Sequence, residues 1–316
     1  MNDEAKLAVV LPLEPEENNE DVYRLVRAVL RPEKTRLRRI YVWRPMWSDV
    51  FLPEGAYVVP EIARAELEAE LAAGDLFLRA GAPFENLGYT VESDVLKGSP
   101  TSEVLREIER SRADLVIVRV RRDDAPDAQD SRLGGMASAL LHHATCPVLL
   151  HRDIRKDYAV RRILIATDFS QASRNSAAWG LAIAETLDAE AHLLYVVTDR
   201  KGTGLAGKTR LVELATEEIA RWRGGWDPRF PRPVTDAHVI SAPHPAEGVL
   251  QFAEDLAFDF VVLGATGRSA AWAVLLGSTA RTVIRRSRCP VLAIPASSRV
   301  SAEAYLSKVA AVTAAR

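Results

Sequence analysis

Cysteine, surplus charge and long apolar runs are all scarce in this sequence of 316 residues. Its two cysteines are too few for a disulfide framework. Lysine and arginine number 41 against 43 aspartates and glutamates, so no overall positive field favours nucleic acid or an anionic membrane as a partner. No unbroken apolar stretch approaches the 18 residues of a membrane-spanning helix. The first residues lack the basic start and small-residue cleavage site of a signal peptide, so we expect a reduced, cytoplasmic protein.

The sequence is long enough for two domains, and 48% of its residues are hydrophobic, which is enough to form a core in each. Both cysteines open the same tetrapeptide, Cys-Pro-Val-Leu, at Cys146 and at Cys289. A second match supports an internal duplication, because Leu105 precedes Asp114 by the same nine positions that separate Leu250 from Asp259.

Short runs rich in β-branched residues alternate with amphipathic stretches in both halves. The expected strands are 7–11, 40–43, 89–93, 115–118 and 148–150, then 163–167, 192–197, 237–240, 260–263 and 291–294. The expected helices of the second half are 173–187, 209–222, 245–256 and 278–287. This α/β alternation predicts two tandem doubly wound domains, 1–152 and 160–296, each a five-stranded parallel sheet with helices on both faces. A helical tail, 297–316, follows.

The most informative motif follows the fourth strand of the second half: Gly264-Ala-Thr-Gly267, nine residues, then Gly277-Ser278-Thr279. Glycine at a strand end lets a ligand approach the backbone without meeting a Cβ. The helix expected next, with Ser or Thr as its N-cap, offers unpaired N–H groups and a positive dipole end to a phosphate. The carboxyl edge of a parallel sheet is also where ligands bind in open α/β folds.

This pattern, G-x2-G-x9-G-[S/T] followed by a helix and Cys-Pro-Val-Leu, resembles the universal stress protein family in its ATP-binding branch. The segments ending in Asp168 and running through Val196 add to the resemblance, which covers residues 160–296 and extends more faintly to the first half. It implies a Rossmann-like fold of the adenine nucleotide α-hydrolase type. It also implies an intramolecular pseudo-dimer, in which strands 148–150 and 291–294 pair with each other.

The resemblance further implies ATP with Mg²⁺ as the ligand. Asp168 corresponds to the acidic residue that contacts the ribose, and Val196 to the position whose backbone meets adenine. The implied phosphate contacts are Gly264, Thr266 and Gly267 in the loop, then Gly277, Ser278 and Thr279 at the helix start. Ala166 departs from the proline that many relatives have.

The first half does not repeat the glycine loop. Aligning Asp114 with Asp259 places Arg119 and Arg122 opposite Gly264 and Gly267, and aligning the cysteines places 134–135 opposite 277–278 with a loop two residues longer. We align Pro12 with Asp168, which leaves no carboxylate for a ribose. ATP is therefore expected in the second half only. The first-half arginines either bind another anion or are balanced by Asp123, Asp124 and Asp127.

A second nucleotide pattern competes with the first, because residues 202–209, ending in Gly207-Lys208-Thr209, fit the P-loop pattern G-x4-G-K-[S/T]. Four residues separate this segment from its strand, whereas a P-loop leaves its strand directly, and no later strand ends in an aspartate for Mg²⁺. Two interpretations of this segment stay open. It is a P-loop of a hydrolase that acts through Lys208, or Lys208 folds over ATP that is bound at 264–278.

No catalytic or metal-binding set can be assembled from the sequence, so we assign no catalytic residue and no metal ligand. The favoured function is an ATP-binding stress-response and signalling module with an unidentified protein partner, and turnover that is absent or slow. The alternatives are an ATP-dependent enzyme, either the P-loop hydrolase or an adenylyl or phosphoryl transferase, and a structural protein whose motif is vestigial. A homodimer is left open.

Overall fold

A computed structural model describes residues 6–15, 19–45, 60–80, 82–120, 134–198, 205–224, 234–267 and 276–310. The strands are β1 (Leu7–Pro12), β2 (Thr35–Trp43), β3 (Thr90–Lys97), β4 (Leu115–Arg119), β5 (Val148–His151), β6 (Arg162–Ala166), β7 (Glu190–Thr198), β8 (Asp236–Ala242), β9 (Phe260–Gly264) and β10 (Val291–Ile294). The helices are α1 (Glu20–Val29), the short 3₁₀ helix η2 (Pro32–Lys34), α2 (Pro60–Arg79), α3 (Ala82–Asn86), α4 (Pro100–Arg110), α5 (Gly135–His143), α6 (Gln171–Leu187), α7 (Leu205–Gly224), α8 (Pro245–Asp255), α9 (Ser278–Arg286) and α10 (Ala302–Ala310). None of the described helices is long and apolar enough to cross a membrane.

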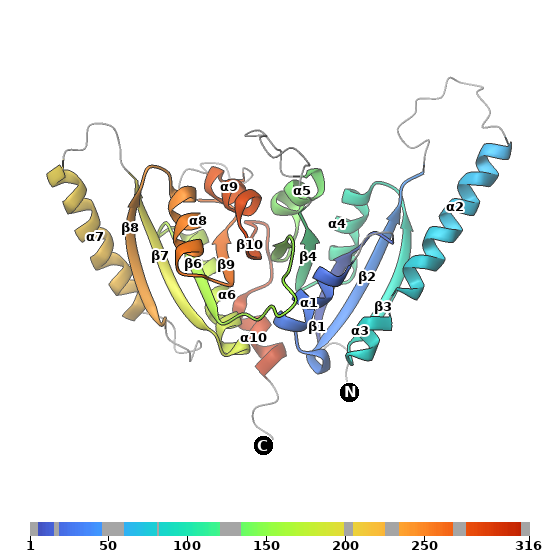
Figure 1. Cartoon of the computed structure of the whole chain (residues 1–316), viewed down its shortest axis with the longest axis horizontal. Coiled ribbons are helices and arrows are strands. Elements are labelled where there is room, and N and C mark those ends of the chain that lie inside the picture. Colours follow the sequence, from blue (N-terminus) through green and yellow to red (C-terminus); the bar gives the residue numbers. More distant parts are fainter. Residues whose placement is uncertain are drawn as a thin grey trace, which may run out of the picture.

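All ten strands join one sheet in the order β3-β2-β1-β4-β5-β10-β9-β6-β7-β8 (Figure 1). Pairing is parallel within each set of five, and the order 3-2-1-4-5 of the first half is mirrored in the second. The two sets meet where β10 runs antiparallel to β5, with Leu292 opposite Leu149. The predicted fold class is confirmed, and the expected pairing of the two last strands is present.

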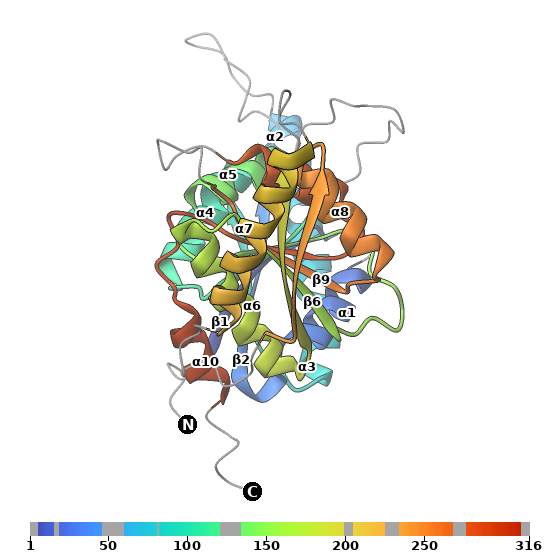
Figure 2. The same ribbon diagram turned by 90° about the vertical axis from the view of Figure 1, so that its left-hand side faces the viewer.

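Alternate residues along each strand face two different helical layers. Ile163 and Ile165 of β6 face the layer of α1, α6 and α10, whereas Leu164 faces the layer of α4, α5, α8 and α9. Figure 1 shows these layers below and above the centre of the sheet, and Figure 2 shows α7 across the outer strands. Each fully buried aliphatic side chain of this kind contributes about 1.5–3 kcal/mol of transfer free energy.

Helix α10 connects the end of the second half to the first half. Tyr305 packs against Trp179 of α6, with ring centroids 5.1 Å apart, and burial raises the pKa of Tyr305 to about 12. Lys308 lies 2.6 Å from a carboxylate oxygen of Asp114, at the start of β4. The described part of the tail, helix α10, therefore packs against α6 and the start of β4.

The duplication extends to single hydrogen bonds. Asp114 accepts a bond of 2.8 Å from the backbone N–H of Ala8, and Asp259 accepts one of 3.1 Å from that of Arg162. The turns that precede them contain the left-handed residues Arg112 and Ala257, each with φ 49°. These matching contacts equate Ala8 with Arg162 and fix the register of the two halves independently of the sequence alignment.

Candidate functional site

The predicted site residues converge at the carboxyl ends of three neighbouring strands. Strand β6 lies between β9 and β7 in the sheet. The chain adds β7 and β8 on one side of β6, and then adds β9 and β10 on the other side. In open α/β sheets such a reversal of strand order marks the crevice where ligands bind. Asp168 follows β6, the glycine loop follows β9, and Val196 lies near the end of β7.

The glycine loop after β9 packs tightly against the backbone. A Cβ at Gly264 would lie 3.1 Å from the carbonyl oxygen of Thr266 and 3.5 Å from that of Ala172, in the first turn of α6. The loop is closed by a bond of 2.8 Å from the backbone N–H of Gly277 to the carbonyl of Ala265. Because backbone atoms surround Gly264, a side chain there would displace the loop itself.

Asp168 lies directly against this loop. Its Oδ1 accepts a bond of 3.0 Å from the backbone N–H of Ser170, and a Cβ at Gly267 would lie 3.0 Å from its Oδ2. The turn is fixed by Phe169, which adopts φ 62° and stacks on Tyr195 with ring centroids 4.5 Å apart. The structure therefore brings Asp168 and Gly267 together, as the resemblance implies.

Helix α9 begins beside the loop, with Gly277 as its N-cap. The expectation that Ser278 or Thr279 caps this helix is wrong, because the bond from Gly277 to Ala265 places the cap one residue earlier and Ser278 is already helical. No described side chain caps this end of the helix. The N–H groups of a first turn have no acceptor within their own helix, so this end suits an anion.

Val196 faces away from the site with its side chain and toward it with its backbone. The side chain is buried beneath α8, where a Cβ at Gly248 would lie 2.8 Å from Val196 Cγ1. The register of β6 with β7 ends at Ala166 opposite Leu194, so the backbone of Val196, which pairs with Ile240 of β8, lies beyond the last residue paired with β6. A backbone contact to a ligand is therefore the contact that this position can offer.

In the first half, an arginine occupies the place of Gly264. Arg119 reaches Asp21 of α1 at 3.4 Å and Asp153 at 3.9 Å, whereas Gly264 meets the backbone of α6. The first half thus fills this space with an ion pair. Arg122, Asp123, Asp124 and Asp127 lie outside the described residues, so their proposed balance of charges is not seen.

The alignment of Pro12 with Asp168 is wrong. Pro12 lies opposite Ile40 in the sheet, and the backbone N–H of the next residue, Leu13, donates to the carbonyl of Ile40. In the second half, Ala166 lies opposite Leu194, and the backbone N–H of Thr167 donates to the carbonyl of Leu194. Pro12 therefore corresponds to Ala166. Two residues further on, the counterpart of Asp168 is Glu14, an exposed residue, so the first half does keep a carboxylate after its first strand.

The competing P-loop segment is described only in part. Residues 202–204 and the side chain of Lys208 lie outside the described residues, and Gly207 to Thr209 are already within helix α7. Both cysteines are free thiols: Cys146 is buried, Cys289 is half-buried, and burial raises the pKa of both.

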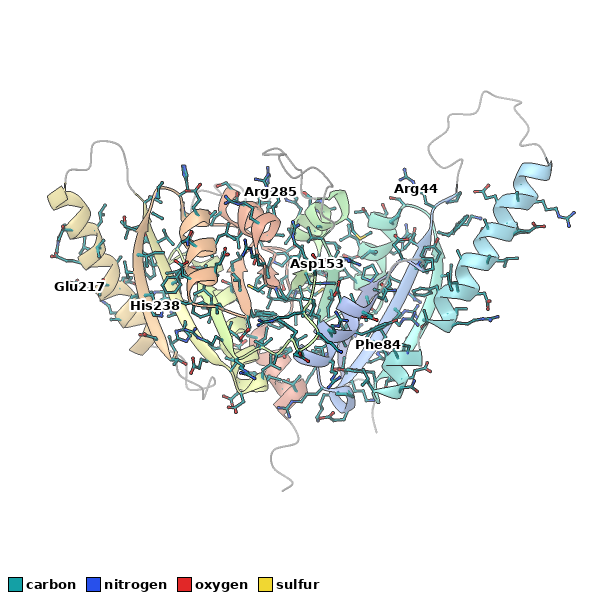
Figure 3. The ribbon with its side chains drawn as sticks, viewed as in Figure 1. Arg44, Phe84, Asp153, Glu217, His238 and Arg285 are labelled. Atoms are coloured by element: carbon teal, nitrogen blue, oxygen red, sulfur yellow. The ribbon has the colours of Figure 1, made fainter. Side chains whose placement is uncertain are left out.

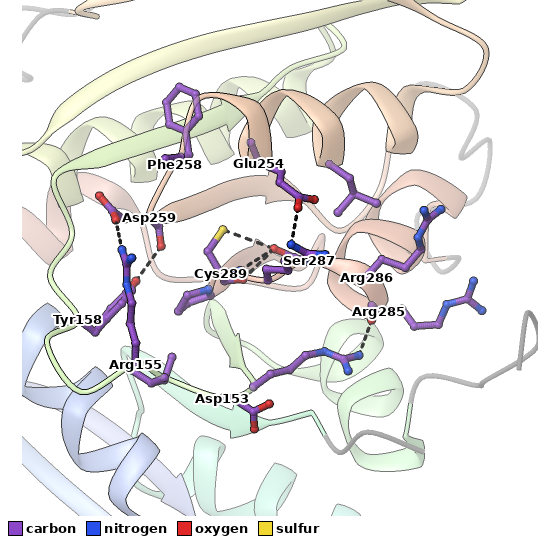
Figure 4. Close-up of a pocket in the computed structure, with 17 residues that line it drawn as sticks. Asp153, Arg155, Tyr158, Glu254, Phe258, Asp259, Arg285, Arg286, Ser287 and Cys289 are labelled. Carbon is purple, nitrogen blue, oxygen red and sulfur yellow. Dashed lines mark hydrogen bonds and ion pairs between the residues drawn. The ribbon is translucent and has the colours of Figure 1, made fainter. Parts of the chain in front are cut away.

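A cavity of about 920 Å³ lies at the opposite end of β9 and β10, under the segment that joins the halves (Figure 4). Two ion pairs lie along it, Arg155 with Asp259 and Arg288 with Glu254. Arg155 reaches Asp259 at 2.9 Å, and the Tyr158 hydroxyl donates to the backbone carbonyl of Asp259. These contacts hold the joining segment against the start of β9, and we assign the cavity no ligand.

A cluster that the sequence analysis missed lies on β7 and β8: His192, Asp236 and His238. The alternation along the strands held the signal, since Asp236 and His238 are two residues apart and share a face. Only the strand register shows that this face adjoins His192.

Comparisons with known proteins agree with the fold. The model of the universal stress protein family matches residues 8–152 and again 159–295. The chain is 27% identical over 253 residues to a universal stress protein of Mycobacterium tuberculosis, covering 78% of this chain and 81% of that protein. It is 31% identical over 144 residues to one of Methanocaldococcus jannaschii, covering 42% of this chain and 81% of that protein. The crystal structure of a universal stress protein from Archaeoglobus fulgidus shares the fold, with a TM-score of 0.63 at 19% identity over 90% of this chain and 97% of that one.

Proposed function

The chain belongs to the universal stress protein family, and from this premise we propose that it is a stress-response module that binds one ATP molecule in its second half. The observation that carries the proposal is the combination of a glycine loop against backbone, a helix start with no described side-chain cap, and the Asp168 carboxylate beside them. Together these groups suit a polyphosphate joined to a ribose.

The order of the strands matches the order of groups in the nucleotide. Adenine would lie at the backbone of Val196 on β7, the ribose at Asp168 after β6, and the phosphates at the loop after β9. Strands in a sheet are about 4.8 Å apart, so β7 and β9 are separated by roughly 10 Å, which suits an extended nucleotide. The loop residues Gly264, Thr266 and Gly267 would lie along the phosphates.

The start of α9 would hold the terminal phosphates. Its first-turn N–H groups donate without a side chain in the way, and the exposed hydroxyl of Ser278 and that of Thr279 add two donors. Mg²⁺ would come bound to the phosphates, because this ion keeps several waters and takes only one or two protein oxygens.

We further propose that ATP serves as a bound signal and is not turned over quickly. Asp168 is held by the backbone of Ser170 and lies against Gly267, an arrangement that suits a ribose contact more than proton transfer. Occupancy would then be read by a protein partner at this edge of the sheet.

Mass spectrometry of the ligand released from freshly purified, denatured protein tests the assignment, together with the stoichiometry of ATP binding in calorimetry. One ATP per chain supports the proposal, whereas none or two contradict it. ATP hydrolysis measured in parallel with Lys208→Ala tests the enzyme alternative: rapid turnover that this variant abolishes would replace the binding module with a P-loop enzyme.

A further inference from the structure

Two histidines and an aspartate meet on the face of the sheet that α8 covers, away from the nucleotide site. His192 lies near the start of β7, directly opposite Asp236, and His238 lies two residues further along β8 (Figure 3 labels His238). The side chain of His192 is 8% exposed, that of His238 is 23% exposed and that of Asp236 is 51% exposed. The group is therefore anchored inside and open to solvent on one side.

Two of the three ligand atoms already have the separation that a metal ion requires, and the third lies close to it. Nδ1 of His192 lies 3.2 Å from Nε2 of His238. The same Nε2 of His238 lies 3.7 Å from Oδ2 of Asp236. Two nitrogens that each lie about 2.05 Å from a tetrahedral ion are about 3.3 Å apart. The two imidazoles thus already have this spacing, and a small rotation of Asp236 completes a three-ligand set.

A supporting carboxylate stands behind the more buried histidine. Nε2 of His192 lies 3.3 Å from Oε2 of Glu190, and Arg162 lies 3.6 Å from the same oxygen. A metal-binding histidine usually donates its other N–H to a carboxylate, which fixes the ring and its tautomer. Phe258 packs edge-on against His192, with centroids 5.1 Å apart, and closes the inner side.

The equivalent place in the first half already holds a cation. The register equates His192, Asp236 and His238 with Arg38, Glu92 and Asp94. There the Arg38 guanidinium lies 2.9 Å from Asp94 and 2.9 Å from Glu107, a residue of α4. Phe252 of α8 takes the place of Glu107, and its ring lies 4.9 Å from that of His238.

In the second half, the His192 imidazole thus replaces the Arg38 guanidinium, and the His238 imidazole replaces the Asp94 carboxylate. We propose that His192, Asp236 and His238 bind a divalent transition-metal ion, with zinc the best match to two imidazoles and one carboxylate at this spacing. The ion joins the edge strand β8 to β7 and leaves its outer coordination positions to water.

Titration of the full chain with Co²⁺, followed by competition with Zn²⁺, tests this site. The expected result is one ion per chain, with the visible absorption of low-coordinate Co²⁺, which Zn²⁺ removes. His238→Ala and Asp236→Asn should each weaken Zn²⁺ affinity at least tenfold. His244→Ala is the matched control, since this exposed histidine at the start of α8 belongs to no metal-ligand group among the described residues and its loss should leave Zn²⁺ affinity unchanged.

Thermal unfolding provides a second readout that does not depend on the spectrum. An ion that binds the native state alone raises Tm, so Zn²⁺ should stabilise the unaltered chain and His244→Ala equally and Asp236→Asn much less. Absence of Co²⁺ binding, or binding and stabilisation that persist unchanged in His238→Ala and Asp236→Asn, would overturn the proposal and leave a hydrogen-bonded histidine pair.

Discussion

The two halves of this chain share their strand order and helical layers and differ in the side chains at the carboxyl edge of the sheet. Each half has five parallel strands in the same order. In each half a glycine is the N-cap of the helix before the last strand: Gly134 precedes α5, and Gly277 precedes α9. Only the second half has a glycine against its first helix, because Arg119 replaces Gly264 in the first. A duplicated fold can therefore keep its buried strands while the side chains at the carboxyl edge of its sheet change.

The corrected register sharpens this comparison. Because Glu14 corresponds to Asp168, and Val42 to Val196, the first half retains two of the positions that the proposed site uses. At the end of β4, however, Arg119 stands where the second half has Gly264. Among the described residues, the comparison of the two halves at the proposed phosphate position therefore rests on this one exchange.

The largest expected effect comes from copying Arg119 into the second half. Gly264→Arg places a long side chain where backbone oxygens of Thr266 and Ala172 lie within 3.5 Å of the Cβ position, so the loop must move away from the phosphates. ATP affinity measured by calorimetry should fall by about 100-fold or more, which corresponds to about 2.7 kcal/mol. The matched change Arg119→Gly should leave ATP affinity unaltered. Unchanged affinity in Gly264→Arg would remove the glycine loop from the site.

A smaller loss is expected when the two carboxylates after the first strands are removed in turn. Asp168→Ala deletes a charged acceptor, and hydrogen bonds of that kind contribute about 1.5–3 kcal/mol, so ATP affinity should fall roughly 10- to 100-fold. Glu14→Ala is the counterpart in the first half and should have no effect on ATP. Equal losses in both variants would mean that both halves bind nucleotide.

A finer test uses the contact between Asp168 and Gly267. In Gly267→Ala the new methyl group would lie 3.0 Å from Oδ2 of Asp168, which can shift by a few tenths of an ångström without moving the backbone. ATP affinity should fall about fivefold, or about 1 kcal/mol, while Tm stays the same. Gly134→Ala in the first half meets nothing within 4 Å and should leave ATP affinity unchanged. A fall in Tm without a change in affinity would make Gly267 a structural residue only.

The sequence located the ten described strands and the order of the halves, because most buried parallel strands are continuous apolar runs and each run occurs twice. It missed residues 35–39 of β2 and 94–97 of β3, where charged and polar residues interrupt the apolar pattern. The cysteine alignment also located both last helices, which begin one residue after Gly134 and Gly277 as the spacing indicates. These features depend on local pattern or on repeated spacing, both of which a single sequence contains.

Other features depend on which residues lie opposite each other, and the sequence alone does not contain that information. The alignment of Pro12 failed because the segment after β1 has no repeated anchor, whereas its pairing with Ile40 is unambiguous in the sheet. The cluster of His192 and His238 was missed for the same reason, since 46 positions separate the two side chains and only the pairing of β7 with β8 joins them.

The smallest expected effect concerns a histidine at the junction of the halves. His151, the last residue of β5, corresponds to Ile294 of β10, because each accepts the backbone bond of the residue after the neighbouring strand, Val120 or Ala265. Burial lowers the pKa of His151, and the nearby Arg119 lowers it further, whereas its bond to the Arg152 carbonyl and the charges of Asp21 and Asp153 raise it. Its Nε2 has no hydrogen-bond partner among the described residues. The ring therefore stays neutral in the folded chain at a pH where the unfolded chain binds a proton.

Because the folded pKa lies below the unfolded value of about 6.5, His151 costs no stability above that pH and destabilises the fold as the pH falls from 6.5 toward the folded pKa. His151→Ile, which copies the second half, removes this protonation. At pH 5.5 the variant should lose less stability than the unaltered chain, so its Tm should fall less, while the two differ little in slope above pH 7. His143→Ala, at an exposed histidine of α5, controls for protonation in general and should keep the original profile. Parallel Tm profiles of His151→Ile and the unaltered chain between pH 7 and 5 would show that His151 takes up its proton without unfolding, and that the junction of the halves tolerates charge where the second half has isoleucine.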